Sequence, residues 1–194
     1  MIRRGLRTST RTALSTAWTQ VGTRAWALRR HNEGMAEVVV FGGLPFLHVS
    51  RLEPDRSPDG TVTEFLPQAR YAGAGRDRLN PHGVGPFCRF RAPGAPAKAG
   101  VYVVTSEGQV RYVGIAQNLA QRWGLAGYGS IQPKNCYVGG QSTNCKVNAR
   151  VLGELKAGRN LDLYFLDSED RQRIEARLIR DLGPPWNGRQ SPRT

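Results

Sequence analysis

The stretch AGVYVVTSEGQVRYVGIAQNLAQRW, residues 99–123, decides the fold class. Two apolar runs, GVYVVT and VRYVG, stand on either side of SEG, a pattern that predicts two antiparallel strands joined by a tight turn. Asn118 follows as a helix N-cap, and Gln121 three residues later completes a capping-box pattern, so NLAQRW begins a helix. The stretch therefore predicts a β-hairpin that leads directly into a helix.

The register of this hairpin decides whether Tyr102 and Tyr112 share a face. A two-residue turn at Glu107-Gly108 would send the tyrosines to opposite faces and force Glu107 to a positive φ. A three-residue loop that begins at Ser106 avoids this strain, because only Gly108 then adopts the left-handed conformation. We therefore expect Tyr102 to face Tyr112 directly, either as a stacked pair that only stabilises the sheet or as part of a site.

Regular elements continue after the hairpin and predict an α+β fold. Residues 145–158 and 168–183 carry apolar side chains at helical spacing, and Ser168 is the expected cap of the second of these helices. Between them, LDLYFL (161–166) reads as a strand. The order strand, strand, helix, helix, strand, helix predicts a small central antiparallel sheet that starts with a β-hairpin and is flanked by helices.

Residues 36–98 form a β-rich accessory segment in this prediction. Short β-branched runs broken by Gly and Pro predict two strands within 37–52 and one strand each in TVTEFLPQARY (61–71) and FCRFRA (87–92). The Pro/Gly/Ala-rich PGAPAKAG (93–100) marks the boundary to a domain of residues 99–190. We expect the accessory segment to extend the sheet of that domain or to contact nucleic acid.

The chain is strongly basic, with 28 Lys and Arg against 15 Asp and Glu and a net charge of +13. Residues 1–34 carry seven Arg and one Glu, so the N-terminal extension (1–35), which we expect to be disordered, supplies +6 and the rest keeps +7. A surplus in both parts indicates an anionic partner, and nucleic acid is the usual one.

Cysteine content and hydropathy bear on location. Three cysteines are too few and too odd in number for a disulfide framework, which favours a reducing, cytoplasmic setting. The Arg- and Ser/Thr-rich N-terminus leaves an organellar transit peptide as an alternative. Eight residues separate Cys136 from Cys145 and no paired His follows, which argues against zinc. No run reaches the ~18 apolar residues of a spanning helix, so we expect no membrane partner.

The motifs around the two tyrosines resemble a known family. Gly100-Val101-Tyr102, then Tyr112-Val113-Gly114 and Arg122 at the start of a helix, with Glu175 on a late helix and Asn187 in PPWN, resemble the GIY-YIG nuclease superfamily. The spacing is similar to that of its restriction-endonuclease-like branch. A helix start beside an arginine also suits an anion such as phosphate.

This resemblance implies a metal-dependent DNA endonuclease that hydrolyses phosphodiester bonds with Mg²⁺ or Mn²⁺. Glu175 would bind the metal, Arg122 would neutralise charge on the phosphate, and Asn187 would orient a tyrosine or a backbone segment. Tyr112 or Tyr102 would deprotonate or orient the attacking water. A phenol with an ordinary pKa near ~10 is a poor base at neutral pH, so nearby cations are expected to lower it. A homodimer is compatible with cutting two strands.

Two positions depart from the family pattern and leave alternatives open. Ile115 stands where many relatives have Lys, and Ala126 where many have His or Tyr, a role that Tyr128 could take if the helix ends early. The chain could therefore be a non-catalytic nucleic-acid-binding module on the same fold, or a structural interaction domain with the aromatic pair as core. Candidate DNA contacts are Arg89 and Arg91 (on one face of a strand, opposite Cys88 and Phe90), Tyr128, Gln141, Asn144 and Lys146.

Overall fold

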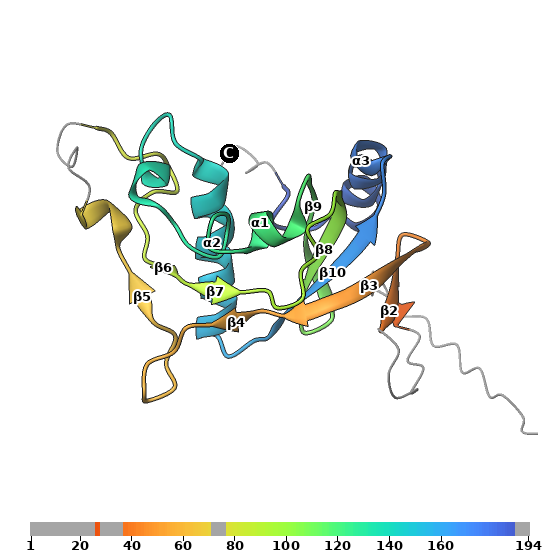
Figure 1. Ribbon diagram of the computed structural model, residues 1–194, viewed down its shortest axis with the longest axis horizontal. Helices are drawn as coiled ribbons and strands as arrows, with labels where there is room; N and C mark the ends of the chain where they lie inside the picture. Colours follow the sequence, from red (N-terminus) through yellow and green to blue (C-terminus); the bar gives the residue numbers. More distant parts are fainter. Residues whose placement is uncertain (1–25, 28–36, 71–76, 189–194) are drawn as a thin grey trace, which may run out of the picture.

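The fold is built around one antiparallel sheet in a computed structural model that describes residues 26–27, 37–70 and 77–188 (Figure 1). The strand order is β1-β2-β3-β10-β8-β9. The strands are β1 (Trp26–Ala27), β2 (Val38–Phe41), β3 (Leu44–Arg51), β8 (Gly100–Ser106), β9 (Gln109–Ala116) and β10 (Leu161–Asp167). Apart from β1, the predicted N-terminal extension lies outside the described residues.

The accessory segment joins the same sheet as residues 99–190. Strands β2 and β3 form a hairpin whose turn is Gly42-Gly43, both with positive φ (54° and 79°), a conformation that glycine adopts at little cost. Strand β3 then pairs with β10, which pairs with β8 on its other side. The expectation that the segment extends the sheet is therefore confirmed.

Helices cover both faces of the sheet, which confirms the α+β class. Alternate residues of β8 enter different cores, because successive side chains of a strand point to opposite faces. Tyr102 and Val104 pack with α1 (Leu119–Trp123) and α2 (Ser142–Lys156). Val101 and Val103 pack with α3 (Arg171–Leu182). None of the helices that the structure describes is long and apolar enough to cross a bilayer.

Short elements complete the accessory segment. They are β4 (Glu53–Pro54), β5 (Glu64–Phe65), the 3₁₀ helix η1 (Pro67–Arg70), β6 (Phe87–Cys88) and β7 (Phe90–Arg91). A second 3₁₀ helix, η2 (Pro133–Cys136), lies outside this segment, between α1 and α2. The single strand expected over 61–71 is only β5, because Pro67 lacks the N–H that a strand would use and begins η1. FCRFRA is two strands that meet at Arg89 and pair with different partners, β5 and β4.

Two helices begin elsewhere than predicted. Helix α2 begins at Ser142, three residues before the predicted start at 145, so Asn144 lies inside it. Helix α3 begins at Arg171, and the hydroxyl of Ser168 accepts a hydrogen bond from the Asp170 N–H (3.2 Å) in the turn before it. The end of α3 agrees with the prediction, because Gly183 follows in the left-handed conformation (φ 56°).

Candidate active site

The turn of the β8–β9 hairpin differs from the prediction. It has two residues, Glu107 and Gly108, with φ angles of 48° and 74°, so Ser106 faces Gln109. The expected three-residue loop is wrong, and Glu107 does adopt the positive φ that the prediction avoided. The Glu107 carboxylate accepts a hydrogen bond from the Asn160 N–H (2.8 Å), a contact that fixes the turn from outside the hairpin.

A β-bulge nevertheless returns the two tyrosines to one face. Thr105 faces Val110 but Val104 faces Tyr112, so Arg111 is the extra residue of β9. Tyr102 consequently lies opposite Gly114, and Tyr112 is its diagonal neighbour with 6.0 Å between ring centroids. The direct cross-strand pairing expected from sequence is therefore wrong, whereas the shared face holds.

Gly114 is required by this arrangement. A Cβ on Gly114 would collide with the hydroxyl and ring carbons of Tyr102. The missing side chain lets the Tyr102 ring lie across β9, where it is buried (1% exposed). The second triplet of the motif thus needs its glycine because the tyrosine of the first triplet occupies that space.

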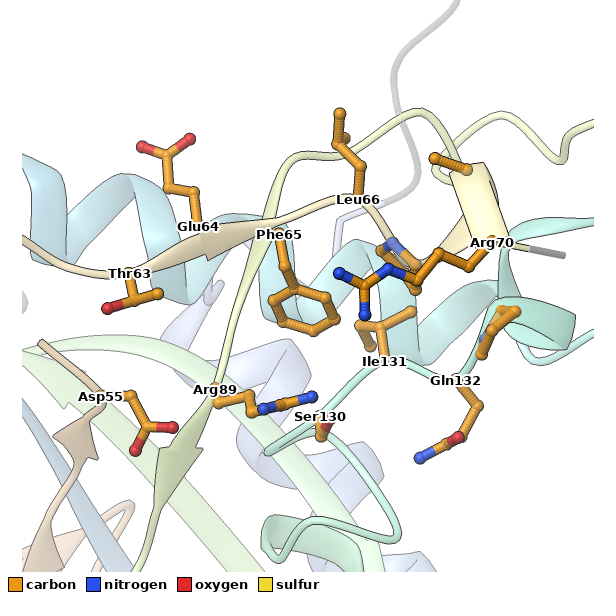
Figure 2. A pocket seen from close by; sticks show the side chains of 13 residues that line it. Asp55, Thr63, Glu64, Phe65, Leu66, Arg70, Arg89, Ser130, Ile131 and Gln132 are labelled. Atoms are coloured by element: carbon orange, nitrogen blue, oxygen red, sulfur yellow. The ribbon is translucent and has the colours of Figure 1, made fainter. Parts of the chain in front are cut away.

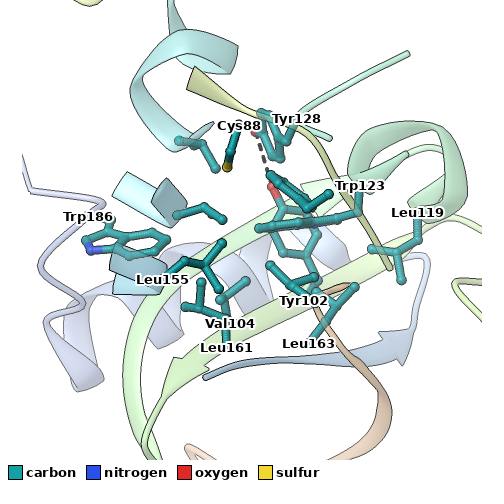
Figure 3. Close-up of a cluster of buried hydrophobic side chains, with 14 of the residues drawn as sticks. Cys88, Tyr102, Val104, Leu119, Trp123, Tyr128, Leu155, Leu161, Leu163 and Trp186 are labelled. Atoms are coloured by element: carbon teal, nitrogen blue, oxygen red, sulfur yellow. Dashed lines mark hydrogen bonds between the residues drawn. The ribbon is translucent and has the colours of Figure 1, made fainter. Parts of the chain in front are cut away.

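Aromatic rings surround Tyr102 on this face (Figure 3). The Trp123 ring packs edge-on against Tyr102, with centroids 5.5 Å apart, and against Tyr128 at 5.1 Å. Helix α1 ends early, at Trp123, and the following loop brings the Tyr128 hydroxyl to 3.4 Å from that of Tyr102. Tyr128 is itself buried (2% exposed). Both rings therefore form the inner layer of the site.

Arg122 lies at the outer side of this cluster. It is half-buried, and its guanidinium carbon is 5.5 Å from the centroid of the Tyr128 ring, within range of a cation–π interaction. Since α1 has five residues, Arg122 stands in its last turn and not in the first turn as predicted. The contact with the Tyr128 ring, and not the start of the helix, therefore places Arg122 beside the tyrosines.

Burial sets the ionisation of the tyrosines. It is the largest cause of a Tyr102 pKa well above the ordinary value; the neighbouring Tyr128 and Tyr112 add to it, while the Arg122 charge opposes it. The pKa of Tyr112 is also raised, first by burial and then by Tyr128, with a further contribution from the Glu175 charge. Arg122 alone therefore does not lower the tyrosine pKa values below the ordinary one, and both phenols are neutral hydrogen-bonding groups at neutral pH.

Glu175 is a half-buried carboxylate on α3. Burial raises its pKa, and no hydrogen bond or ion pair engages it among the described residues. Its charge acts on Tyr112, whereas the Arg122 charge acts on Tyr102. We call Arg122, Tyr102, Tyr128, Tyr112 and Glu175 the tyrosine row, in the order in which these effects link the cation to the tyrosines and the tyrosines to the carboxylate.

Asn187 fixes the edge of the sheet beside Tyr112. Its amide oxygen accepts from the Val113 N–H (2.8 Å), and its amide nitrogen donates to the Val113 carbonyl (2.7 Å). The next residue back, Trp186, donates its N–H to the Arg111 carbonyl (3.0 Å) and packs its ring near Tyr112 (6.5 Å between centroids). Asn187 therefore orients a backbone segment, one of the two roles expected for it.

Two of the predicted DNA contacts are not on the surface. Asn144 is 2% exposed, and its side-chain amide donates to that of Gln141 (2.8 Å). Tyr128 is equally buried in the aromatic cluster. Neither side chain can reach a nucleic acid without a rearrangement of the core, because both have their polar atoms facing protein groups.

The other candidate contacts are accessible. Arg89 and Arg91 are exposed and alternate with buried Cys88 and Phe90, as the strand pattern predicts. The Arg91 side chain pairs with Asp55 (3.3 Å), whereas Arg89 lies over an aromatic ring. Gln141 is exposed, and Lys146 is half-buried with a pKa lowered by burial and then by the nearby Arg150 charge. These positions remain candidates for phosphate contacts.

Asn148 is a structural residue of the site, and the sequence did not predict that it ties α2 to two other segments. It is fully buried on α2; its amide oxygen accepts from the Cys88 N–H (3.0 Å), and its amide nitrogen donates to the carbonyls of Cys88 and Tyr128 (2.8 Å each). The sequence does carry a signal for this role. Asn148 is an amide within an apolar helical stripe, and a buried polar side chain needs hydrogen-bond partners.

The departures from the family pattern have clear places in the fold. Ile115 packs into the core under α3, on the face opposite Tyr102, so a side chain there points away from the aromatic cluster. Ala126 is exposed in the loop that follows α1.

Comparisons of the chain with protein-family models, with curated proteins and with solved structures found no match.

Proposed function

We propose that this protein is a metal-dependent DNA endonuclease of the GIY-YIG type, which hydrolyses phosphodiester bonds. The observation that carries the proposal is the half-buried Glu175 carboxylate, which has no partner among the described residues and whose charge acts on Tyr112. Burying a carboxylate without a partner is unfavourable, so its position favours a role in holding a cation. Arg122, at the other end of the row, suits a phosphate.

The donor set fits a single Mg²⁺ or Mn²⁺ ion. Magnesium is commonly held by one or two carboxylates, with waters and substrate phosphate oxygens as its other ligands. Among the described residues there is no group of three or more His, Cys, Asp and Glu side chains that could hold a metal, so Glu175 would be the protein's main ligand. A bound ion would polarise a phosphoryl oxygen and stabilise the leaving oxygen.

The side chains of the row divide into an accessible and a buried layer. Tyr112, Arg122 and Glu175 are half-buried and open to a ligand, whereas Tyr102 and Tyr128 are buried behind them. In the proposed reaction the neutral Tyr112 phenol orients the attacking water or a phosphate oxygen, and Arg122 neutralises the charge that develops on the phosphate. Tyr102 is then a positioning residue, which acts by holding Tyr112.

One observation favours a second candidate function, a non-catalytic nucleic-acid-binding module. Both tyrosine pKa values are raised, so neither phenol is a ready base at neutral pH. The net charge of +13 serves binding as well as catalysis. The two functions differ in one observable, which is metal-dependent breakage of the DNA backbone.

The test is a cleavage assay with purified protein on plasmid DNA, with Mg²⁺ or Mn²⁺ and with EDTA as the metal-free control. Glu175→Gln and Arg122→Gln keep the size of the side chain or shorten it while removing the charge. Each should lower the cleavage rate by about 100-fold or more, the effect of removing one group that stabilises transition-state charge. The matched control is Glu169→Gln, which removes an exposed carboxylate just before α3 and should cleave as the wild type does.

The outcomes separate the two functions. Cleavage that needs the metal and is lost in both variants but not in the control supports the endonuclease. Wild-type protein that retards DNA on a gel and leaves it intact with either metal supports the binding module. Full activity in Glu175→Gln would contradict the role given to this carboxylate.

A further inference from the structure

A second polar site lies in the accessory segment, apart from the tyrosine row. It is a cavity of about 630 Å³ between β5, η1 and residues 130–133 (Figure 2). This volume is within the range of pockets that bind small ligands. The lining side chains that matter here are Phe65, Leu66, Arg70, Arg89, Ile131 and Gln132.

Two guanidinium groups point into this cavity. Figure 2 shows the side chains of Arg70 and Arg89 extending toward each other on either side of the Phe65 ring. The Arg89 guanidinium carbon lies 5.2 Å from the centroid of that ring. Arginine pairs of this kind suit phosphate, because each guanidinium can donate two parallel hydrogen bonds to its oxygens.

Two acidic residues, Asp55 and Glu64, also line the cavity but do not neutralise these arginines. Asp55 pairs with Arg91 (3.3 Å) and Glu64 pairs with Lys156 (2.5 Å), so both carboxylates have cations of their own. Within the described ranges, no ion pair joins Arg70 or Arg89 to an acid. The cavity therefore presents two uncompensated positive charges.

Apolar and aromatic side chains line another part of the cavity. The Phe65 ring is half-buried, and Leu66 is 49% exposed beside it. Ile131 closes the wall, and the Gln132 amide lies at its edge. An aromatic ring with an arginine is a stacking surface for a nucleobase, and an amide can hydrogen-bond to a base edge. The lining thus combines a phosphate site with a base site.

We propose that this cavity binds one unpaired nucleotide of the nucleic-acid strand that the protein acts on. The proposal rests on the proposed function, because it takes nucleic acid as the ligand. A base inside a duplex is stacked and paired, so it can enter the cavity only from a flipped position, a mismatch, a strand end or a gap.

The cavity is structurally connected to the tyrosine row. Tyr128 belongs to the row and Ser130, two residues later, lines the cavity. Between them, the Gly129 carbonyl accepts the Phe90 N–H (3.0 Å), which fastens this loop to β7. One short, fixed segment of the chain therefore joins the two sites.

The test measures binding without cleavage. Fluorescence anisotropy in EDTA compares two labelled duplexes that differ only at one central site, an unpaired nucleotide in one and an abasic residue in the other. The pocket variants are Arg70→Gln/Arg89→Gln, which removes the two charges, and Phe65→Leu, which removes the ring. The matched control is Arg173→Gln/Arg180→Gln, which removes two exposed charges of α3 that already pair with Asp170 and Asp181.

The wild type should bind the unpaired nucleotide about tenfold more tightly than the abasic duplex, the typical effect of one base stacked on an aromatic side chain. Both pocket variants should lose this preference, and the control should keep it. Equal binding of the two duplexes by the wild type, or a preference that survives both pocket variants, overturns the proposal. This binding assay contains no metal, so its result does not depend on cleavage. A protein that keeps the preference here but does not cut DNA in the assay with Mg²⁺ or Mn²⁺ would contradict the endonuclease proposal alone.

Discussion

Asn148 offers a direct test of how the site is held together. Replacing it with alanine removes three buried hydrogen bonds, which its amide makes with Cys88 (3.0 and 2.8 Å) and Tyr128 (2.8 Å). Each such bond contributes about 1 kcal/mol net, and each buried backbone group left without a partner costs about 1–3 kcal/mol. We therefore expect Asn148→Ala to lower the free energy of unfolding by about 3–4 kcal/mol, a large part of a typical domain's stability.

The assay is urea unfolding followed by tryptophan fluorescence, since Trp123 lies in the same core. The midpoint should fall while the m-value stays the same, because the surface exposed on unfolding is unchanged. Asn160→Ala is the matched control: its side chain is exposed, so its effect should stay within about 0.5 kcal/mol. A loss below about 1 kcal/mol in Asn148→Ala would refute the reasoning, because three buried bonds cannot be that weak.

Two further predictions concern the hairpin. Gly114→Ala should destabilise the protein by about 1–3 kcal/mol, since its Cβ collides with Tyr102. Gly153→Ala, at an exposed position of α2 with no neighbour in reach, should stabilise it by about 0.5–1 kcal/mol. Thermal unfolding measures both, and a Gly114→Ala protein as stable as the wild type would contradict the packing. The raised pKa values of Tyr102 and Tyr112 contribute stability that is complete below pH ~10 and is lost as the pH rises above it, at about 1.4 kcal/mol per pH unit for each tyrosine. Urea unfolding between pH 9 and 11 should therefore show a steeper loss in the wild type than in Tyr102→Phe/Tyr112→Phe, and parallel losses would argue against buried phenols.

Periodicity predicted the elements of this fold because it reports which side of an element is buried. The strands β8, β9 and β10 and the helix α3 follow from it, and so does the shared face of the two tyrosines. The hairpin register did not follow, because contacts from outside the hairpin hold the strained Glu107 turn. In the structure, Asn160 donates to the Glu107 carboxylate (2.8 Å), and Trp186 donates to the bulged Arg111 (3.0 Å). These contacts come from distant parts of the chain.

The electrostatics of the site could be predicted only in part. The sequence indicated that a cation and a carboxylate accompany the tyrosines, and the structure couples Arg122 to Tyr102 and Glu175 to Tyr112. Arg122 alone does not set the sign of the tyrosine shifts, because that sign depends on burial. The Tyr102 ring, enclosed by Trp123 and Tyr128, loses hydration, and that loss outweighs the charge of one half-buried guanidinium.

The bulge at Arg111 gives two tyrosines from similar triplets different environments. Had the prediction of direct pairing been right, both rings would lie side by side with equal access to a ligand. With one extra residue in β9, Tyr102 instead lies over Gly114 and directs its hydroxyl to Tyr128, while Tyr112 moves along the strand toward the Glu175 end of the row. In the proposed nuclease, only Tyr112 is placed to meet the substrate. A single backbone irregularity thus separates a positioning tyrosine from a reactive one, and two equivalent residues would not do so.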